Sequence, residues 1–174
     1  MKIRLITAIV ALLLCSLAYS QSPKKVQNTV DKEVKAYRKV LEKNGDYDSL
    51  MIAFSIDTFK VEHTFSATIA DMVNSPQILD AVYQATAEYD KLLNKYYNML
   101  LVKLKSEDKK ALLKAQKAWL SFRDAEQNLI GVMSAEQYSG GGSIQKDINA
   151  GTYQELIESR LVHIINHLNK ISTF

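Results

Sequence analysis

The chain contains little that would cross-link or interrupt it. Its 174 residues include one cysteine, Cys15, with only two prolines and six glycines. With no second cysteine, an intrachain disulfide is excluded, and the fold must be stabilised by packing. The scarcity of proline and glycine leaves long stretches rich in Leu, Lys, Glu and Ala, which favours long helices.

The motifs that mark common enzyme classes are also missing. The sequence has no nucleophile elbow, no phosphate-binding loop and no dinucleotide fingerprint. Its acidic residues are scattered over amphipathic segments, so spacing alone identifies no carboxylate pair for glycoside chemistry. We therefore expect a protein that is not an enzyme and that carries no cofactor.

The N-terminus has the order of a secretory signal peptide. Basic residues in Met1–Arg4 precede an apolar run over Leu5–Leu14, and Ala18 and Ser20 are the small residues before a cleavage site. The run is shorter than the roughly 20 residues of a membrane span. We predict a signal peptide at 1–20 and an exported protein, periplasmic or secreted. An uncleaved anchor, or a lipid on Cys15, remains an alternative.

Removal of residues 1–20 changes the charge of the remaining chain. Of 22 basic side chains, Lys2 and Arg4 are lost, which leaves 20 against 19 acidic ones. Cys15 is lost as well. A nearly neutral surface gives no reason to expect nucleic-acid binding. We expect residues 21–174 to form a single domain with no transmembrane span, of a size that buries a core.

Apolar residues recur at steps of three and four through most of this domain, which predicts helices over 25–43, 75–104 and 106–133 and a last helix from Thr152. Residues 47–73 fit both an alternating strand and a longer helical stripe, and we favour the helix. We place Ser75, Ser106 and Thr152 as N-terminal caps. The predicted fold class is all-α, a compact antiparallel bundle of about four to five helices.

The predicted core stripes name the side chains that should be buried. The third helix contributes Leu79, Val82, Thr86, Tyr89, Leu93, Tyr96 and Leu100. The fourth contributes Leu112, Ala115, Trp119, Phe122, Leu129 and Met133, interrupted by Glu126. The last contributes Ile157, Leu161, Ile164, Leu168 and Ile171.

Four short motifs then occur in a fixed order. They are Asp90-Lys91-Leu92-Leu93-Asn94-Lys95-Tyr96-Tyr97, Gln116-Lys117-Ala118-Trp119-Leu120-Ser121-Phe122-Arg123-Asp124, Gly140-Gly141-Gly142-Ser143 and Leu156-Ile157-Glu158-Ser159-Arg160. Over residues 78–170 the chain resembles the LprI-like lysozyme-inhibitor N-terminal domain family. The resemblance implies a small, all-helical envelope protein whose protein partner is lysozyme.

The chain departs from the family pattern in identifiable places. Many members carry cysteines where this chain has Asp80 or Ala81, Gln127 and Thr152, so the resemblance implies a branch without disulfides. Ile157 also replaces the usual threonine. A structural or assembly factor of the periplasm, with no inhibitory activity, is the alternative function. A glycan hydrolase would need a pocket with two convergent carboxylates.

Candidate site residues fall into a loop and a set of motif side chains. Gly140, Gly141, Gly142 and Ser143 form either a partner-binding loop or a flexible connection. The motif side chains, which we expect to be structural, are Asp90, Asn94, Tyr97, Gln116, Trp119, Arg123, Asp124 and Arg160.

Each role has an alternative. The aromatics Tyr97, Trp119 and Phe122 are expected in the core rather than on a binding surface. Arg123, Asp124, Glu126 and Arg160 are expected to form ion pairs between helices, rather than an anion or sugar site. Asn94 and Gln116 are expected to bond backbone groups at a helix contact or a loop.

His163 and His167 have a spacing that can hold a metal, but no third ligand is evident, so we expect no metal site. The partner and the oligomeric state remain open.

Overall fold

The computed structural model describes residues 23–45, 47–70, 72 and 75–172. The predicted signal peptide and Cys15 lie outside these residues. The helices are α2 (Pro23–Asn44), α3 (Ser49–Ile69), α4 (Ser75–Lys103), α5 (Ser106–Met133), α6 (Glu136–Ser139) and α7 (Ile144–Ser172). The all-α bundle is confirmed, and α3 confirms the helical interpretation of residues 47–73.

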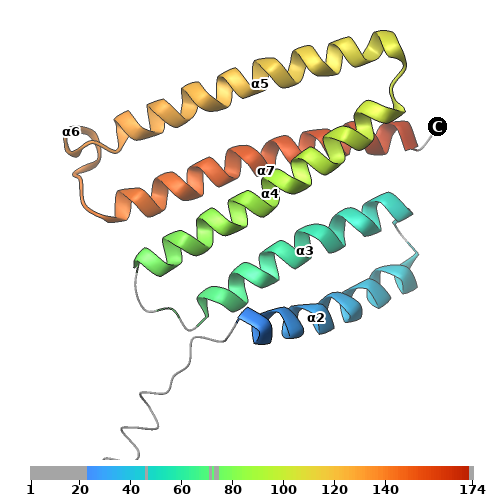
Figure 1. The fold of residues 1–174 in the computed structure, drawn as a ribbon, viewed down its shortest axis with the longest axis horizontal. Coiled ribbons are helices and arrows are strands. Elements are labelled where there is room, and N and C mark those ends of the chain that lie inside the picture. The colour runs from blue at the N-terminus through green and yellow to red at the C-terminus, as the bar shows by residue number, and fades with distance from the viewer. Residues whose placement is uncertain (1–22, 46, 71, 73–74, 173–174) are drawn as a thin grey trace, which may run out of the picture.

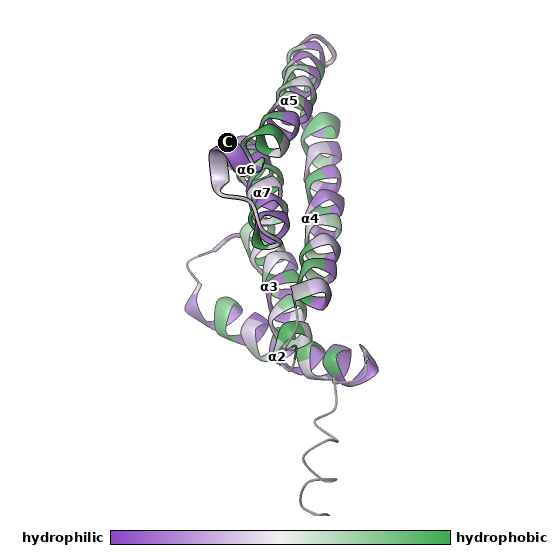
Figure 2. Cartoon of the chain, turned by 90° about the vertical axis from the view of Figure 1, so that its left-hand side faces the viewer, coloured by the Kyte–Doolittle hydropathy of each residue, from purple (hydrophilic) through white to green (hydrophobic). Residues whose placement is uncertain are grey.

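The long helices lie in a row rather than around a common axis. Figure 1 shows the order α2, α3, α4, α7 and α5 across the molecule. The most extensive contact joins α4 to α7, and α3 packs on α4 while α2 packs on α3. α5 lies at the opposite end and packs mainly on α7. Figure 2 shows the molecule from the side, with α5 and α2 at the two ends and α4 and α7 side by side between them.

The first two helices form an antiparallel hairpin with clear end signals. α2 buries Val26, Val30 and Leu41. Gly45 follows the helix with φ of 69°, a left-handed conformation that glycine adopts without strain. The carboxylate of Asp48 then caps α3 by accepting the Met51 amide at 2.8 Å.

The core lies between α3, α4 and α7. The predicted stripes of α4 and α7 are confirmed at most positions, because their side chains interlock along the contact of these two helices. The core residues of α4 and α7 that are essentially inaccessible to solvent are Leu93, Tyr96, Leu100, Ile157, Leu161, Ile164, Ile165 and Leu168. The exception is Ile171 near the end of α7, which is 38% exposed.

The predicted range of α5 is confirmed, but its predicted capping residue and the predicted start of the last helix are wrong. Lys105, with extended φ and ψ, occupies the cap position of α5, so Ser106 is already helical and makes no cap bond. α7 begins at Ile144, directly after the glycine loop, and Thr152 lies inside it. The Thr152 hydroxyl donates to the Ile148 carbonyl at 2.9 Å, which satisfies it within the helix.

The predicted core stripe of α5 is wrong over most of its length. Leu112 is buried, but Phe122, Leu129 and Met133 are 52%, 50% and 51% exposed, and Ala115 is exposed as well. The reason is the rotation of the helix about its axis. α5 turns a more polar side toward its neighbours. The half-buried residues on this side of α5 are Gln116, Trp119, Arg123, Glu126 and Ile130.

Candidate functional site

Motif side chains of three helices are linked where α5 packs on α7. Arg123 and Arg160 lie against Trp119, and Asp90 and Tyr97 of α4 lie near the two arginines. We call them the motif cluster. Its members are Asp90, Asn94 and Tyr97 from α4, Gln116, Trp119, Arg123 and Asp124 from α5, and Arg160 from α7. Segments far apart in the sequence therefore meet at one place, which local spacing could not establish.

Trp119 is the centre of the motif cluster. The Cζ atom of Arg123 lies 5.5 Å from the Trp119 ring centroid, and that of Arg160 lies 5.7 Å from it. A guanidinium at this distance is attracted to an indole ring, and partial burial strengthens the attraction. Since Arg160 belongs to α7, this stacking fastens α5 to α7. Trp119 packs at the edge of the core, as expected.

Arg160 also bonds directly to α5. Its Nε and Nη2 atoms donate to Oε1 of Gln116 at 3.1 and 3.0 Å. Among the residues that the structure describes, no carboxylate forms an ion pair with Arg160. Burial therefore lowers the pKa of this guanidinium, and the proximity of Tyr97 opposes that effect. The amide of Gln116 is thus a side-chain acceptor, and the expectation that it bonds backbone groups is wrong.

Arg123 makes the only ion pair of the motif cluster within the described ranges. Its Nε and Nη2 atoms donate to Oδ1 of Asp124 at 2.9 and 2.6 Å. Burial acts to lower the pKa of Arg123, but the hydrogen bond to Asp124 and the nearby Tyr153 and Asp90 raise it overall. Both partners belong to α5. The expected ion pairs between helices are therefore replaced by hydrogen bonds from the charged Arg160 to the neutral amide of Gln116, and by stacking on Trp119.

The α4 members make contacts within their own helix or with the core. The amide of Asn94 donates to the Asp90 carbonyl at 2.9 Å and to its carboxylate Oδ2 at 3.1 Å. Asn94 therefore bonds a backbone group, but it does so within α4 and not at a helix contact or loop as expected. Tyr97 is half-buried and packs against the core. Phe122, the third aromatic that we placed in the core, projects from the motif cluster into solvent.

The glycine loop forms the tip of the hairpin between α5 and α7. Gly140, Gly141 and Gly142 have φ of 77°, 73° and 92°, a run of left-handed conformations. The amides of Gly140 and Gly141 donate to the Glu136 carbonyl and the Ser139 hydroxyl. These two hydrogen bonds and the three left-handed glycines define the turn. Tyr138 and Ile144 flank it, and their side chains are 58% and 57% exposed.

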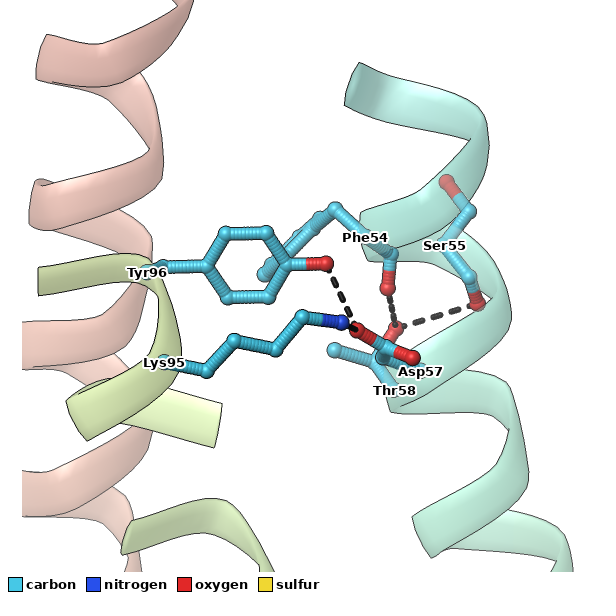
Figure 3. Close-up of polar contacts among 6 residues, drawn as sticks. All are labelled: Phe54, Ser55, Asp57, Thr58, Lys95 and Tyr96. Atoms are coloured by element: carbon cyan, nitrogen blue, oxygen red, sulfur yellow. Dashed lines mark hydrogen bonds and ion pairs between the residues drawn. The ribbon is translucent and has the colours of Figure 1, made fainter. Parts of the chain in front are cut away.

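A polar link between α3 and α4 was not identified from the sequence. The Tyr96 hydroxyl, on a ring that is fully buried, donates to Oδ2 of Asp57 at 2.7 Å, and Lys95 forms an ion pair with the same oxygen. Figure 3 shows both side chains reaching from α4 to Asp57 on α3. The sequence did contain one sign of this link, because the acidic Asp57 lies between the apolar positions Phe54 and Val61.

Two hollows border the helix contacts. A groove of about 590 Å³ lies between α3 and α4, and one of about 250 Å³ lies between α5 and α7. The larger groove contains the carboxylates of Asp57 and Glu88, which are both ion-paired with lysines. It thus offers no pair of free acids for a hydrolase.

The histidines of α7 give no metal site in the described part of the chain. His163 and His167 are both exposed. Over residues 23–45, 47–70, 72 and 75–172, no three side chains of His, Cys, Asp or Glu approach one another closely enough to hold an ion. None of the helices described is long and apolar enough to cross a membrane.

The sequence profile of the family described as "Lysozyme inhibitor LprI" matches residues 68–163. This range includes every member of the motif cluster. The chain belongs to the lysozyme inhibitor LprI family. The resemblance drawn from the motifs is thereby confirmed, and the LprI family is one of inhibitors rather than catalysts. No curated protein and no solved structure gives a significant match to this LprI-family chain.

Proposed function

We propose that this LprI-family protein is an exported binding protein of the cell envelope that inhibits lysozyme-type hydrolases. The observation that carries the proposal is the family match over 68–163. Export rests on the signal-like pattern of residues 1–20. Inhibition by binding is favoured over catalysis because the carboxylates of the larger groove are already paired with lysines.

The tip of the α5–α7 hairpin is the surface that we assign to lysozyme. A glycoside hydrolase of this type has two carboxylates in an open cleft. A narrow turn with glycines at three successive positions brings its backbone close to a partner, because no side chains intervene. No acceptor within the described residues takes the amide N–H of Gly142 or Ser143, so both remain available to a carboxylate. Tyr138 adds an exposed aromatic contact.

Lysis of bacterial cell walls by lysozyme tests the proposal. The chain without residues 1–20 should slow lysis in a saturable manner as its concentration rises. Tyr138→Ala should weaken inhibition by about tenfold, as expected for an exposed aromatic at an interface. The matched control is Tyr83→Ala, a tyrosine with similar exposure (53%) on α4. Unchanged lysis at micromolar excess of the protein would contradict inhibition.

A second function is supported by the exposed apolar side chains of α5. Phe122, Leu129 and Val132 are each about half exposed, and such a surface is typical of protein contact sites. A structural or assembly factor of the periplasm would use it without inhibiting lysozyme. Binding of an envelope protein by the purified chain, together with unimpaired lysis, would favour this function over inhibition.

A further inference from the structure

Arg160 carries a positive charge that no acidic side chain neutralises within the described residues. Asp90 and Asp124, the acidic members of the motif cluster, each accept hydrogen bonds from a residue of their own helix instead. Arg160 donates only to the neutral amide of Gln116, and it is half-buried. A charge in this position costs free energy unless an opposite charge pairs with it. The motif cluster thus holds a cation whose counter-charge does not come from the described part of the chain.

The free edge of the Arg160 guanidinium has the geometry of a carboxylate site. A guanidinium has five N–H donors in a planar arrangement. The two bonds to Gln116 come from Nε and Nη2, on one side of the group. No acceptor among the described residues takes the remaining N–H groups at its outer end, on Nη1 and Nη2. Two parallel N–H groups of this kind bind the two oxygens of one carboxylate.

Tyr97 and Trp119 prepare this edge for a ligand. Tyr97 of α4 lies close enough to act on Arg160, whose pKa it raises against the effect of burial. The Tyr97 hydroxyl has no hydrogen-bond partner in the described ranges, so it is available to donate to a ligand oxygen. The Cζ atom of Arg160 lies 5.7 Å from the ring centroid of Trp119, and this stacking holds the plane of the guanidinium. A donor that is held in place before binding loses less freedom when the ligand arrives.

We propose that Arg160 binds a carboxylate group from outside the chain through its free edge, with the Tyr97 hydroxyl as a second donor. A single guanidinium matches the single charge of a carboxylate. Arg123 lies against the same indole ring, but Asp124 and Asp90 both act on it and offset its charge. A phosphate group, with a charge of roughly −1.5 to −2 at neutral pH, would therefore gain little from Arg123.

This carboxylate site is separate from the glycine loop that we assign to lysozyme. The loop joins the end of α5 to the start of α7, and Arg160 lies roughly 24 Å along the α7 axis from Ile144. A ligand at Arg160 goes beyond the proposed inhibition, and neither function requires the other. Two sources present the same chemical group, namely a small organic acid and an acidic side chain of a protein.

The emission of Trp119, the single tryptophan of the chain, reports occupancy of the site. Acetate, exchanged for chloride at constant ionic strength, should change the emission of the chain without residues 1–20 in a saturable manner. Aspartate blocked at both ends should bind more tightly than acetate if the source is a protein side chain, and no more tightly if it is a small organic acid. The absence of a saturable response to acetate, or tighter binding of inorganic phosphate, would overturn the proposal.

Substitutions of Arg160 test the role of its planar fork. Two-dimensional NMR of backbone amides measures the affinity here, because the emission of Trp119 changes when its contact with the guanidinium is removed. Arg160→Met should lower the affinity for acetate by at least about tenfold, and Arg160→Lys should recover only part of it. Arg38→Met is the matched control, because it removes the same charge from a half-exposed side chain of α2. Equal effects of Arg38→Met and Arg160→Met would reduce the binding to attraction by net charge.

Tyr97→Phe keeps the aromatic ring and removes only the hydroxyl. It should weaken acetate binding by about three- to tenfold, while the midpoint of urea unfolding stays close to that of the unaltered chain. Tyr83→Phe, at an exposed tyrosine of the same helix, is the control and should leave binding unchanged. This pair tests the site even if Arg160→Met does not fold. Binding by Tyr97→Phe as tight as that of the unaltered chain would contradict the proposed site.

Discussion

The two ends of the helix row differ in how their helices use apolar residues. α2 buries Val26, Val30 and Leu41 against its neighbour, and its Tyr37 stacks on Phe59 of α3 with ring centroids 4.3 Å apart. α5 is longer, yet Leu112 is its only buried residue. On α2 the apolar side is the docked side. On α5 the docked side is partly polar, and the more apolar side faces solvent.

This difference indicates that hydrophobic burial holds one end and specific polar contacts hold the other. Burial stabilises in proportion to the apolar area removed from water. α2 is therefore held against α3 by the burial of its apolar side chains. α5 is fastened through the motif cluster, where geometry matters more than area. The contacts among Gln116, Trp119, Arg123 and Arg160 therefore describe how α5 is fastened to α7.

The largest expected effect is a cavity at the α2 end. Leu41 is 5% exposed, and Leu41→Ala should lower the free energy of unfolding by about 2–4 kcal/mol. Leu129→Ala removes the same atoms from a side chain that is 50% exposed on α5, and should cost less than about 0.5 kcal/mol. Urea unfolding of dilute protein measures both. Equal losses would mean that α5 is docked by burial after all.

A second prediction concerns pH and the tyrosines of α4. Burial raises the pKa of Tyr89 and Tyr96 well above the ordinary value of 10.0; nearby carboxylates, Glu158 and Glu62 for Tyr89 and Asp57 for Tyr96, raise it further. The unfolded chain releases these protons near pH 10, while the folded chain keeps them. Their contribution to stability is therefore complete below pH 10 and is lost progressively above it, by about 1.4 kcal/mol per pH unit for each tyrosine.

Unfolding experiments from neutral to alkaline pH measure this slope. Tyr96→Phe should reduce the alkaline slope by about half, since one of the two groups no longer titrates. Tyr83→Phe, at a tyrosine that is 53% exposed, serves as the control and should leave the slope unchanged. If all three proteins lose stability equally above pH 10, the buried tyrosines are not the cause.

The sequence predicted the buried sides of α2, α4 and α7 better than it predicted the buried side of α5. Steps of three and four identify a helix and its apolar side, and on α2, α4 and α7 that side is buried. On α5 the residues Leu112, Trp119 and Phe122 looked like one stripe, but the helix divides them between two sides. Which side docks depends on Arg160, which lies far away in the sequence and bonds Gln116 at 3.0 and 3.1 Å.

The candidate site shows the same division between local and long-range information. The members of the motif cluster were identified because they occur as short motifs. Their arrangement was predicted incorrectly, since pairs of opposite charge suggested ion pairs between helices, while Trp119 instead attracts two guanidiniums. The predicted helix start at Thr152 was also wrong, because a cap-like sequence occurs inside a longer helix. There the Thr152 hydroxyl donates to the Ile148 carbonyl instead of capping a helix end.

The smallest expected effect is at the joint between α5 and α7. Arg160→Met keeps much of the side-chain volume but removes both bonds to Gln116 and the stacking on Trp119. It should lower the free energy of unfolding by about 1–2 kcal/mol. Arg160→Lys retains the charge but not the planar fork, and should recover only part of that loss. The more informative readout is local.

Amide hydrogen exchange separates a local effect from a global one. If the joint acts as the geometry indicates, Arg160→Met should speed exchange in α5 more than in α2, because α5 has little buried area to hold it once these contacts are gone. The emission of Trp119, the single tryptophan of the chain, should change as its ring loses one guanidinium. Faster exchange to the same extent in α2 and α5 would mean that Arg160 supports the whole row, and that the two ends are not held independently.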